Sequence, residues 1–153
     1  VLLIIDEAQN LSLKLLEQVR MLSNLESENE KLIQIILVGQ PELRTKLNTP
    51  GLRQLRQRIG VRYHIEALSR DETSLYVAHR LSLAGADRRG PIFEETAMDE
   101  VFRYSGGIPR LINMVCNKAL LTGFVMEERL ISEDIVKQCI AEIEGTPAYE
   151  YHQ

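Results

Sequence analysis

Two short apolar runs constrain the fold more than any other feature of the sequence. Val1–Ile5 is continuously apolar and is followed at once by Asp6 and Glu7, and a second apolar run covers residues 32–38. Runs of this kind are typical of strands that are covered on both faces of a parallel sheet. Residues 12–25, between the two runs, have apolar residues at helical spacing. A strand, a helix and a strand within about 38 residues predict a βαβ unit.

The character of the chain changes near Leu68. Before this residue, strand-like and helix-like signals alternate, and Arg62–Ile65 is expected to form a third short strand. After it, every signal is helical: Ser69–Glu72 is a capping box, and Ser132 is expected to cap the last helix. The sequence therefore predicts an α/β unit followed by an all-α unit of four helices. The expected bounds are residues 1–67, residues 68–144 and a tail over residues 145–153.

Composition narrows the class of protein. The chain has 153 residues, of which 44% are apolar and 26% are charged, with a formal net charge of −4. These values fit one globular domain or two small subdomains and exclude a disordered, collagen-like or disulfide-scaffold protein. No apolar run approaches the ~20 residues of a membrane-spanning helix. Cys116 and Cys139 lie on apolar helical faces, which favours buried thiols in a reducing compartment over metal ligands.

Asp6 and Glu7 are the strongest candidates for chemistry. The strand before them would deliver both carboxylates to the carboxyl edge of a parallel sheet, where ligands bind in open α/β folds. Adjacent acids repel each other there unless a cation offsets their charge. Nucleotide hydrolysis fits this arrangement, because one carboxylate can hold Mg²⁺ through water while the next orients the attacking water. The alternative is that both acids cap the following helix or face solvent, although Ser12 is available as that cap.

Gln40 is a second candidate, because it follows the second apolar run and Gly39. Its amide is expected at the same sheet edge as Asp6, where it could bind a phosphate or the attacking water without adding charge. The alternative, favoured by spacing alone, is a polar turn residue before Pro41.

A basic cluster and a single arginine are the remaining candidates. The cluster contains no acidic residue and suggests recognition of a phosphate, although it could also be a solvated face balanced by an acidic helix around Glu26, Glu28 and Glu30. Its members are Arg44, Lys46, Arg53, Arg56, Arg58 and Arg62. Arg110 follows Pro109 in the first turn of a predicted helix, where a cation opposes the helix dipole. That position favours the interpretation that Arg110 binds a phosphate over the alternative that it is an exposed arginine without a role.

In this order, the motifs resemble those of AAA+ ATPases. VLLIIDEAQN looks like a Walker B motif, ILVGQPEL like the sensor 1 strand, LRQLRQRIGVRYHIEAL like the arginine-finger region, and SGGIPRLIN like the sensor 2 helix of the lid. The phrases DEAQNLS, MLSNLE, IILVGQPELR and LRQLRQRI are similar to one subfamily, the ATPase of the general secretion pathway of ExeA or GspA type. The resemblance covers roughly residues 1–143 and implies a partial P-loop NTPase sheet, from Walker B onward, plus a four-helix lid.

The resemblance also implies roles for individual residues. Asp6 would bind nucleotide through a water-coordinated Mg²⁺, and Glu7 would be the catalytic carboxylate acting on ATP. Gln40 would serve both binding and catalysis as sensor 1, and Arg110 would bind nucleotide as sensor 2. These roles follow from the family and not from spacing alone.

The arginine finger implied by the family would be Arg58, with Arg56 as the alternative because its spacing also fits. A finger of this kind acts on the nucleotide of a neighbouring subunit, so the resemblance implies self-association into a ring or filament. The other expected partners are secretion or envelope-assembly proteins. Nucleic acid is not an expected partner, since no aromatic residue interrupts the basic cluster before Tyr63.

The sequence departs from the family in one respect: it contains no G-x-x-x-x-G-K-[ST] phosphate-binding loop. The chain is therefore expected to be the C-terminal part of an ATPase module, inactive alone, from a protein that hydrolyses ATP to drive assembly of a secretion, envelope or exopolysaccharide export system. That protein is expected in the cytoplasm, with inner-membrane association as an alternative. Any membrane contact or peptidoglycan-binding domain would lie in regions outside this chain.

Three other functions fit parts of the sequence. DEAQ resembles motif II of DExx helicases, but no Ser-Ala-Thr-like motif follows it. An AAA+-like, ATP-dependent DNA-binding regulator of transposition or replication initiation is the principal alternative, and it predicts a steeply salt-dependent affinity for DNA. A protein–protein adaptor made of the helical part is the third.

Overall fold

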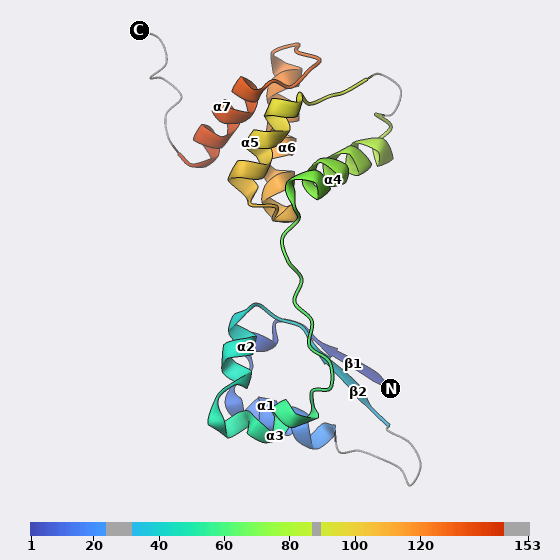
Figure 1. Ribbon diagram of the computed structural model, residues 1–153, viewed down its shortest axis with the longest axis vertical. Coiled ribbons are helices and arrows are strands. Elements are labelled where there is room, and N and C mark those ends of the chain that lie inside the picture. Colours follow the sequence, from blue (N-terminus) through green and yellow to red (C-terminus); the bar gives the residue numbers. More distant parts are fainter. Residues whose placement is uncertain (24–31, 87–89, 146–153) are drawn as a thin grey trace. The chain divides into compact units, whose positions relative to one another are not determined.

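The structure is a computed structural model that describes residues 1–23, 32–86 and 90–145. It contains two compact units, Val1–His64 and Ile65–Gln153 (Figure 1). The acidic residues Glu26, Glu28 and Glu30, which sequence analysis placed on a helix, lie outside the described residues.

The first unit contains the predicted βαβ arrangement. Strands β1 (Leu2–Ile5) and β2 (Gln34–Leu37) pair in parallel, with Leu2 opposite Gln34 and Ile5 opposite Leu37. Helix α1 (Leu13–Leu22) lies between them in the chain. Ser12 is its N-cap, and its Oγ accepts a hydrogen bond of 3.2 Å from the backbone N–H of Leu15. The prediction of a βαβ unit is therefore confirmed.

Short helices complete this unit and its small core. After β1 comes the 3₁₀ turn η1 (Ala8–Asn10), and after β2 come α2 (Glu42–Leu47), η2 (Pro50–Leu52) and α3 (Arg53–Arg58). Leu16, Leu52 and Leu55 form a buried cluster, against which Leu11 and Leu37 pack. The core thus joins α1, η2 and α3 and reaches the sheet through Leu37.

The expectation that both strands are covered on both faces is wrong. Leu2, Ile4 and Ile36 are 54%, 58% and 46% exposed, and no residue of β1 or β2 is fully buried. The reason is that the described helices of this unit provide apolar contacts to one face of the sheet, the one that carries Leu37.

The expected strand at Arg62–Ile65 is also wrong, since the chain has no regular secondary structure there. Its alternating apolar residues Val61, Tyr63 and Ile65 are 86%, 90% and 84% exposed. A strand needs a neighbour that completes its backbone hydrogen bonds, and among the described residues this segment pairs with none.

The second unit contains four described α-helices (Figure 1). Their bounds are α4 (Arg70–Leu83), α5 (Glu95–Ser105), α6 (Pro109–Val125) and α7 (Glu133–Ile143). The predicted capping box is confirmed: Ser69 Oγ accepts from the backbone N–H of Glu72 at 3.3 Å, and the Glu72 carboxylate accepts from the backbone N–H of Ser69 at 2.8 Å. Ser132 caps α7, as predicted.

One continuous apolar core holds these helices together. It includes Val101, Ile112, Val115 and Val136, and a short parallel bridge between Phe93 and Ile131 joins the segments before α5 and α7. Packing of α5, α6 and α7 against one another forms the centre of this unit.

Both cysteines are free and buried in this core, as the sequence predicted. Burial raises the pKa of the Cys116 thiol to about 12, so it is protonated at neutral pH. Burial likewise raises the pKa of Cys139, whose thiol contacts Thr122 Oγ1 at 3.4 Å. None of the described helices is both long and apolar enough to cross a membrane.

Candidate functional site

Asp6 and Glu7 lie in the tight turn that leaves the carboxyl end of β1. Both carboxylates are exposed, and Asp6 Oδ1 accepts a hydrogen bond of 2.7 Å from the backbone N–H of Glu7. Glu7 has a left-handed backbone with φ of 50°, which residues other than glycine adopt rarely. Its side chain does not cap η1, and Ser12 caps α1, so helix capping does not account for either acid.

Gln40 lies beside this turn, at the same edge of the sheet. Val38 O accepts from the backbone N–H of Ala8 at 2.9 Å, and the backbone N–H of Gln40 donates to Gln9 Oε1 at 3.2 Å. The parallel pairing of β1 and β2 therefore brings the turn of Asp6 and Glu7 against the turn of Gln40.

Two residues of this region, Gln9 and Asn10, were missed by sequence reasoning, and a third, Lys46, makes a contact that was not foreseen. Gln9 contacts Gln40, as described above, and Asn10 Nδ2 donates to Glu7 Oε2 at 3.2 Å. Lys46 Nζ donates to the backbone oxygens of Gln9 and Leu11. Two amides that follow the acidic pair after a single alanine were a usable signal, whereas nothing in the sequence indicated the contact of Lys46.

Within the basic cluster, the ammonium of Lys46 donates to two backbone carbonyls of its own unit. Arg44, Arg53 and Arg62 of the same cluster have exposed side chains on the first unit. Arg62 Nη2 donates to the backbone oxygen of Arg56 at 3.0 Å.

The two candidate finger arginines both belong to α3. Arg56 is half-buried, and its Nη1 lies 3.4 Å from Asn48 Oδ1. Arg58 is exposed, and its Nη1 lies 3.4 Å from the backbone oxygen of Ser23. Both contacts are long for hydrogen bonds, so they hold these guanidinium groups only weakly.

Arg110 lies in the second unit, in the first turn of α6. Pro109 begins the helix, and Gly106, with φ of 56°, ends the preceding one. The Arg110 side chain is exposed, and it has no bonded partner among the described residues. The structure therefore presents a cation at a helix start, as the sequence predicted, within a unit separate from that of Asp6.

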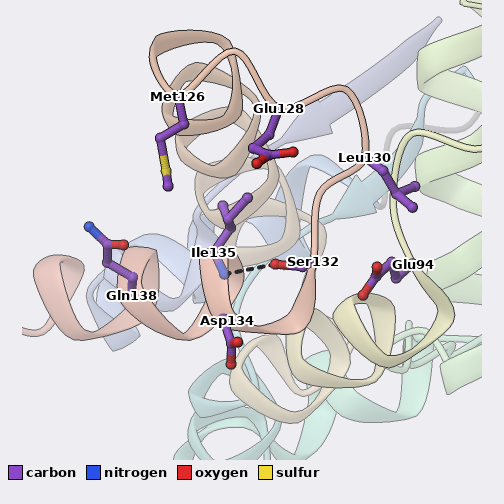
Figure 2. Close-up of a pocket in the computed structure, with 8 residues that line it drawn as sticks. All are labelled: Glu94, Met126, Glu128, Leu130, Ser132, Asp134, Ile135 and Gln138. Carbon is purple, nitrogen blue, oxygen red and sulfur yellow. Dashed lines mark hydrogen bonds between the residues drawn. The ribbon is translucent and has the colours of Figure 1, made fainter. Parts of the chain in front are cut away.

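A cavity of about 400 Å³ lies elsewhere in the second unit, near the start of α7 (Figure 2). Acidic Glu94, Glu128 and Asp134 and apolar Met126 and Leu130 are among its lining residues. It includes none of the residues that the sequence singled out for chemistry.

The oxygen donors at the sheet edge fit a hard divalent cation. Mg²⁺ is usually held by one or two carboxylates together with waters and phosphate oxygens, rather than by a complete protein cage. Asp6 offers such a carboxylate, because only its Oδ1 is hydrogen-bonded within the described part of the chain. That same part has no group of three or more histidine, cysteine or acidic residues that could hold a metal by itself.

Comparison with known structures defines the class of fold. The chain superposes on a variant of RuvB from Thermotoga maritima with a TM-score of 0.69 and 18% identity, over 93% of this chain and 44% of that one. The Thermotoga maritima RuvB Holliday junction branch migration motor gives a TM-score of 0.62 with 18% identity and the same coverage. At this identity the likeness concerns the fold alone, and this chain matches part of the fold of RuvB.

Sequence comparison is more specific. Residues 1–47 match the AAA domain family. The chain is 44% identical over 142 residues to general secretion pathway protein A of Aeromonas hydrophila, which covers 93% of this chain. It spans only 26% of the length of that relative. These matches confirm the resemblance: the chain is similar, over nearly its whole length, to part of an AAA+ protein of the general secretion pathway protein A type.

Proposed function

We propose that this chain is the C-terminal part of an AAA+ module that hydrolyses ATP to drive assembly of a secretion, envelope or exopolysaccharide export system. One observation carries the proposal: the carboxylates of Asp6 and Glu7 share a sheet edge with Gln40. The similarity to general secretion pathway protein A supports the secretion context.

Asp6 is proposed to hold Mg²⁺ through water, and its exposed carboxylate supports this role. The ion, when bound, offsets the charge of the phosphates and of the two neighbouring acids. Glu7 is proposed to accept a hydrogen bond from the attacking water and to orient it toward the terminal phosphorus of ATP. Gln40 would bind a phosphate oxygen or that water through its amide, which adds no charge to the site.

The second unit is proposed to act as the lid, with Arg110 bound to a nucleotide phosphate. An exposed arginine at the start of a helix supports this role, since the backbone N–H groups there also favour an anion. Arg58, with Arg56 as the alternative, would act on the nucleotide of a neighbouring copy in a ring or filament. The single long contact of the Arg58 guanidinium, with the backbone oxygen of Ser23, supports a side chain that can turn toward a partner.

The longer protein is proposed to act in the cytoplasm, with association to the inner membrane through other regions. Its other partners would be secretion or envelope-assembly proteins.

A DNA-binding regulator is the second candidate function for this chain, and the exposed Arg44, Arg53 and Arg62 favour it. A DNA affinity that falls steeply with salt would support this second candidate.

The first test uses the 153-residue chain by itself. Because the chain contains no phosphate-binding loop motif, it should hydrolyse ATP no faster than buffer. Turnover that disappears in Glu7→Gln and persists in the control Glu42→Gln would contradict this expectation, since Glu42 is an exposed acid on α2 of the same unit.

The second test uses the longer protein that we propose carries this segment. Glu7→Gln should retain bound ATP and lose turnover, because the metal carboxylate stays while the water-orienting one is removed. Glu42→Gln should leave both unchanged. Equal loss of ATP binding and turnover in Glu7→Gln would contradict the role of Glu7.

The third test addresses the arginine finger. Arg58→Ala should abolish turnover with ATP binding nearly intact, and mixing it with Glu7→Gln should restore some activity at mixed interfaces. Arg53→Ala is the matched control on the same helix, and Arg56→Ala distinguishes the two candidates. No rescue at any mixing ratio, with assembly confirmed, would refute a finger that acts between subunits.

A further inference from the structure

Gln9 joins the two turns of the candidate site through its side chain. Its half-buried amide lies two residues after Glu7, and its Oε1 accepts a hydrogen bond of 3.2 Å from the backbone N–H of Gln40. A backbone hydrogen bond of 2.9 Å from Ala8 N–H to Val38 O runs beside this contact. The turn after β1 and the turn after β2 are therefore connected at two points.

Lys46 holds Gln9 from the other side. Its half-buried Nζ donates to the backbone oxygens of Gln9 and Leu11, the latter at 2.9 Å. A single ammonium thereby ties η1 and the residue after it to α2. Hydrogen bonds with a charged donor are stronger than neutral ones, so this contact restrains the backbone that follows Glu7.

Because Gly39 has no side chain, there is room beside it for the side chain of Gln9. A Cβ added at Gly39 would lie 2.6 Å from Gln9 Oε1, 3.3 Å from the Gln9 backbone nitrogen and 3.1 Å from Leu43 Cδ2. The contact between the two turns thus depends on a glycine at this position, because a larger residue would push the amide of Gln9 away from Gln40.

We propose that Gln9, held by Lys46, is a positioning residue that couples Gln40 to Glu7. The left-handed backbone of Glu7 requires support from its surroundings, and the two contacts of Gln9 supply it. When a phosphate or water engages the amide of Gln40, a shift of that turn is transmitted through Gln9 to the carboxylate of Glu7. The consequence for catalysis rests on the proposed function, whereas the coupling of the two turns does not.

The first experiment measures the coupling in the 153-residue chain by NMR. Gln9→Met replaces the side chain by one of similar size without the acceptor Oε1, and Gly39→Ala displaces the Gln9 side chain from Gln40. Both substitutions should raise the hydrogen-exchange rate of the Gln40 amide at least tenfold and shift the amide resonance of Glu7. Gln9→Glu, which keeps an acceptor oxygen, should restore slow exchange. Gln18→Ala is the control, because Gln18 is an exposed residue of α1 whose side chain has no bonded partner among the described residues.

Faster exchange of the Gln40 amide with an unmoved Glu7 amide resonance would overturn the coupling. Unchanged exchange of the Gln40 amide in both variants would overturn it as well.

The second experiment measures ATP hydrolysis in the longer protein, where Gln9→Met should lower kcat at least tenfold while KM and ATP affinity stay within twofold. An unchanged kcat, in a wild-type protein that hydrolyses ATP, would also overturn the proposal. A wild-type protein without hydrolysis would refute the proposed function instead, and the NMR result would then decide the coupling alone.

Discussion

Gly107 offers the sharpest test of the packing in the second unit. It is buried in the turn between α5 and α6, with φ of 76°, and its backbone oxygen accepts a hydrogen bond of 2.9 Å from Leu68 N–H. A Cβ added there would lie 1.8 Å from Leu68 O and 2.8 Å from Leu68 C, far inside van der Waals contact. Gly107→Ala therefore cannot be accommodated unless the segment before α4 moves away from this turn.

The cost of this substitution has two parts. The left-handed backbone costs an alanine about 1–2 kcal/mol. Separating Leu68 from Gly107 forfeits a hydrogen bond worth about 0.5–1.5 kcal/mol. We expect Gly107→Ala to lower the free energy of unfolding of the second unit by about 1.5–3.5 kcal/mol, at the upper end of ordinary single substitutions.

Gly106→Ala is the matched control. Gly106 also has positive φ, 56°, but no atom lies within 4 Å of a Cβ added there, so only the backbone cost of about 1–2 kcal/mol applies. Urea unfolding, combined with hydrogen exchange of the α6 amides, reports on the second unit. Equal destabilisation by the two substitutions would refute the close approach of Leu68 to Gly107.

Three further predictions concern stability and reactivity. Hydrogen bonds from the backbone and hydroxyl of Ser69 lower the pKa of Glu72 below 4.5, so the stability they confer is present above that pH and is lost as the pH falls through the lowered pKa. Glu72→Gln should flatten this acid-side loss in urea titrations, and Ser69→Ala should cost about 1 kcal/mol at neutral pH. Leu16→Ala, at a fully buried position, should destabilise the first unit by about 2–5 kcal/mol in chemical denaturation. The Cys116 thiol should react with a disulfide reagent at pH 8 far more slowly in the folded chain than in urea, because burial raises its pKa to about 12.

The helical unit could be predicted closely because its signals are local. A capping box, a cap serine and a glycine that ends a helix each act within a few residues, and the structure contains them at Ser69, Ser132 and Gly106. Apolar residues at helical spacing also identified the core side chains, including both buried cysteines. The close contact of Gly107 with Leu68 could not be read from the sequence, since it joins positions that no periodic pattern relates.

The candidate site could be predicted in part. Asp6, Glu7 and Gln40 each follow a strand, and parallel pairing of the two strands places them at one edge, as the direction of the strands implied. The contact of Lys46 could not be predicted, because charge counting along the chain does not reveal which cation meets a backbone carbonyl. Gln9 was missed for a similar reason, since its role depends on the turn after the other strand.

The two wrong predictions about strands have one physical cause. Val61, Tyr63 and Ile65 alternate as a strand would, and Leu2 and Ile4 are apolar as a covered strand would be, yet all five side chains are exposed. Strand formation and the covering of a sheet face both require a partner supplied by another segment, whereas a helix completes its own backbone hydrogen bonds. The same exposure explains why the sequence pattern was right about the character of these residues and wrong about their structure.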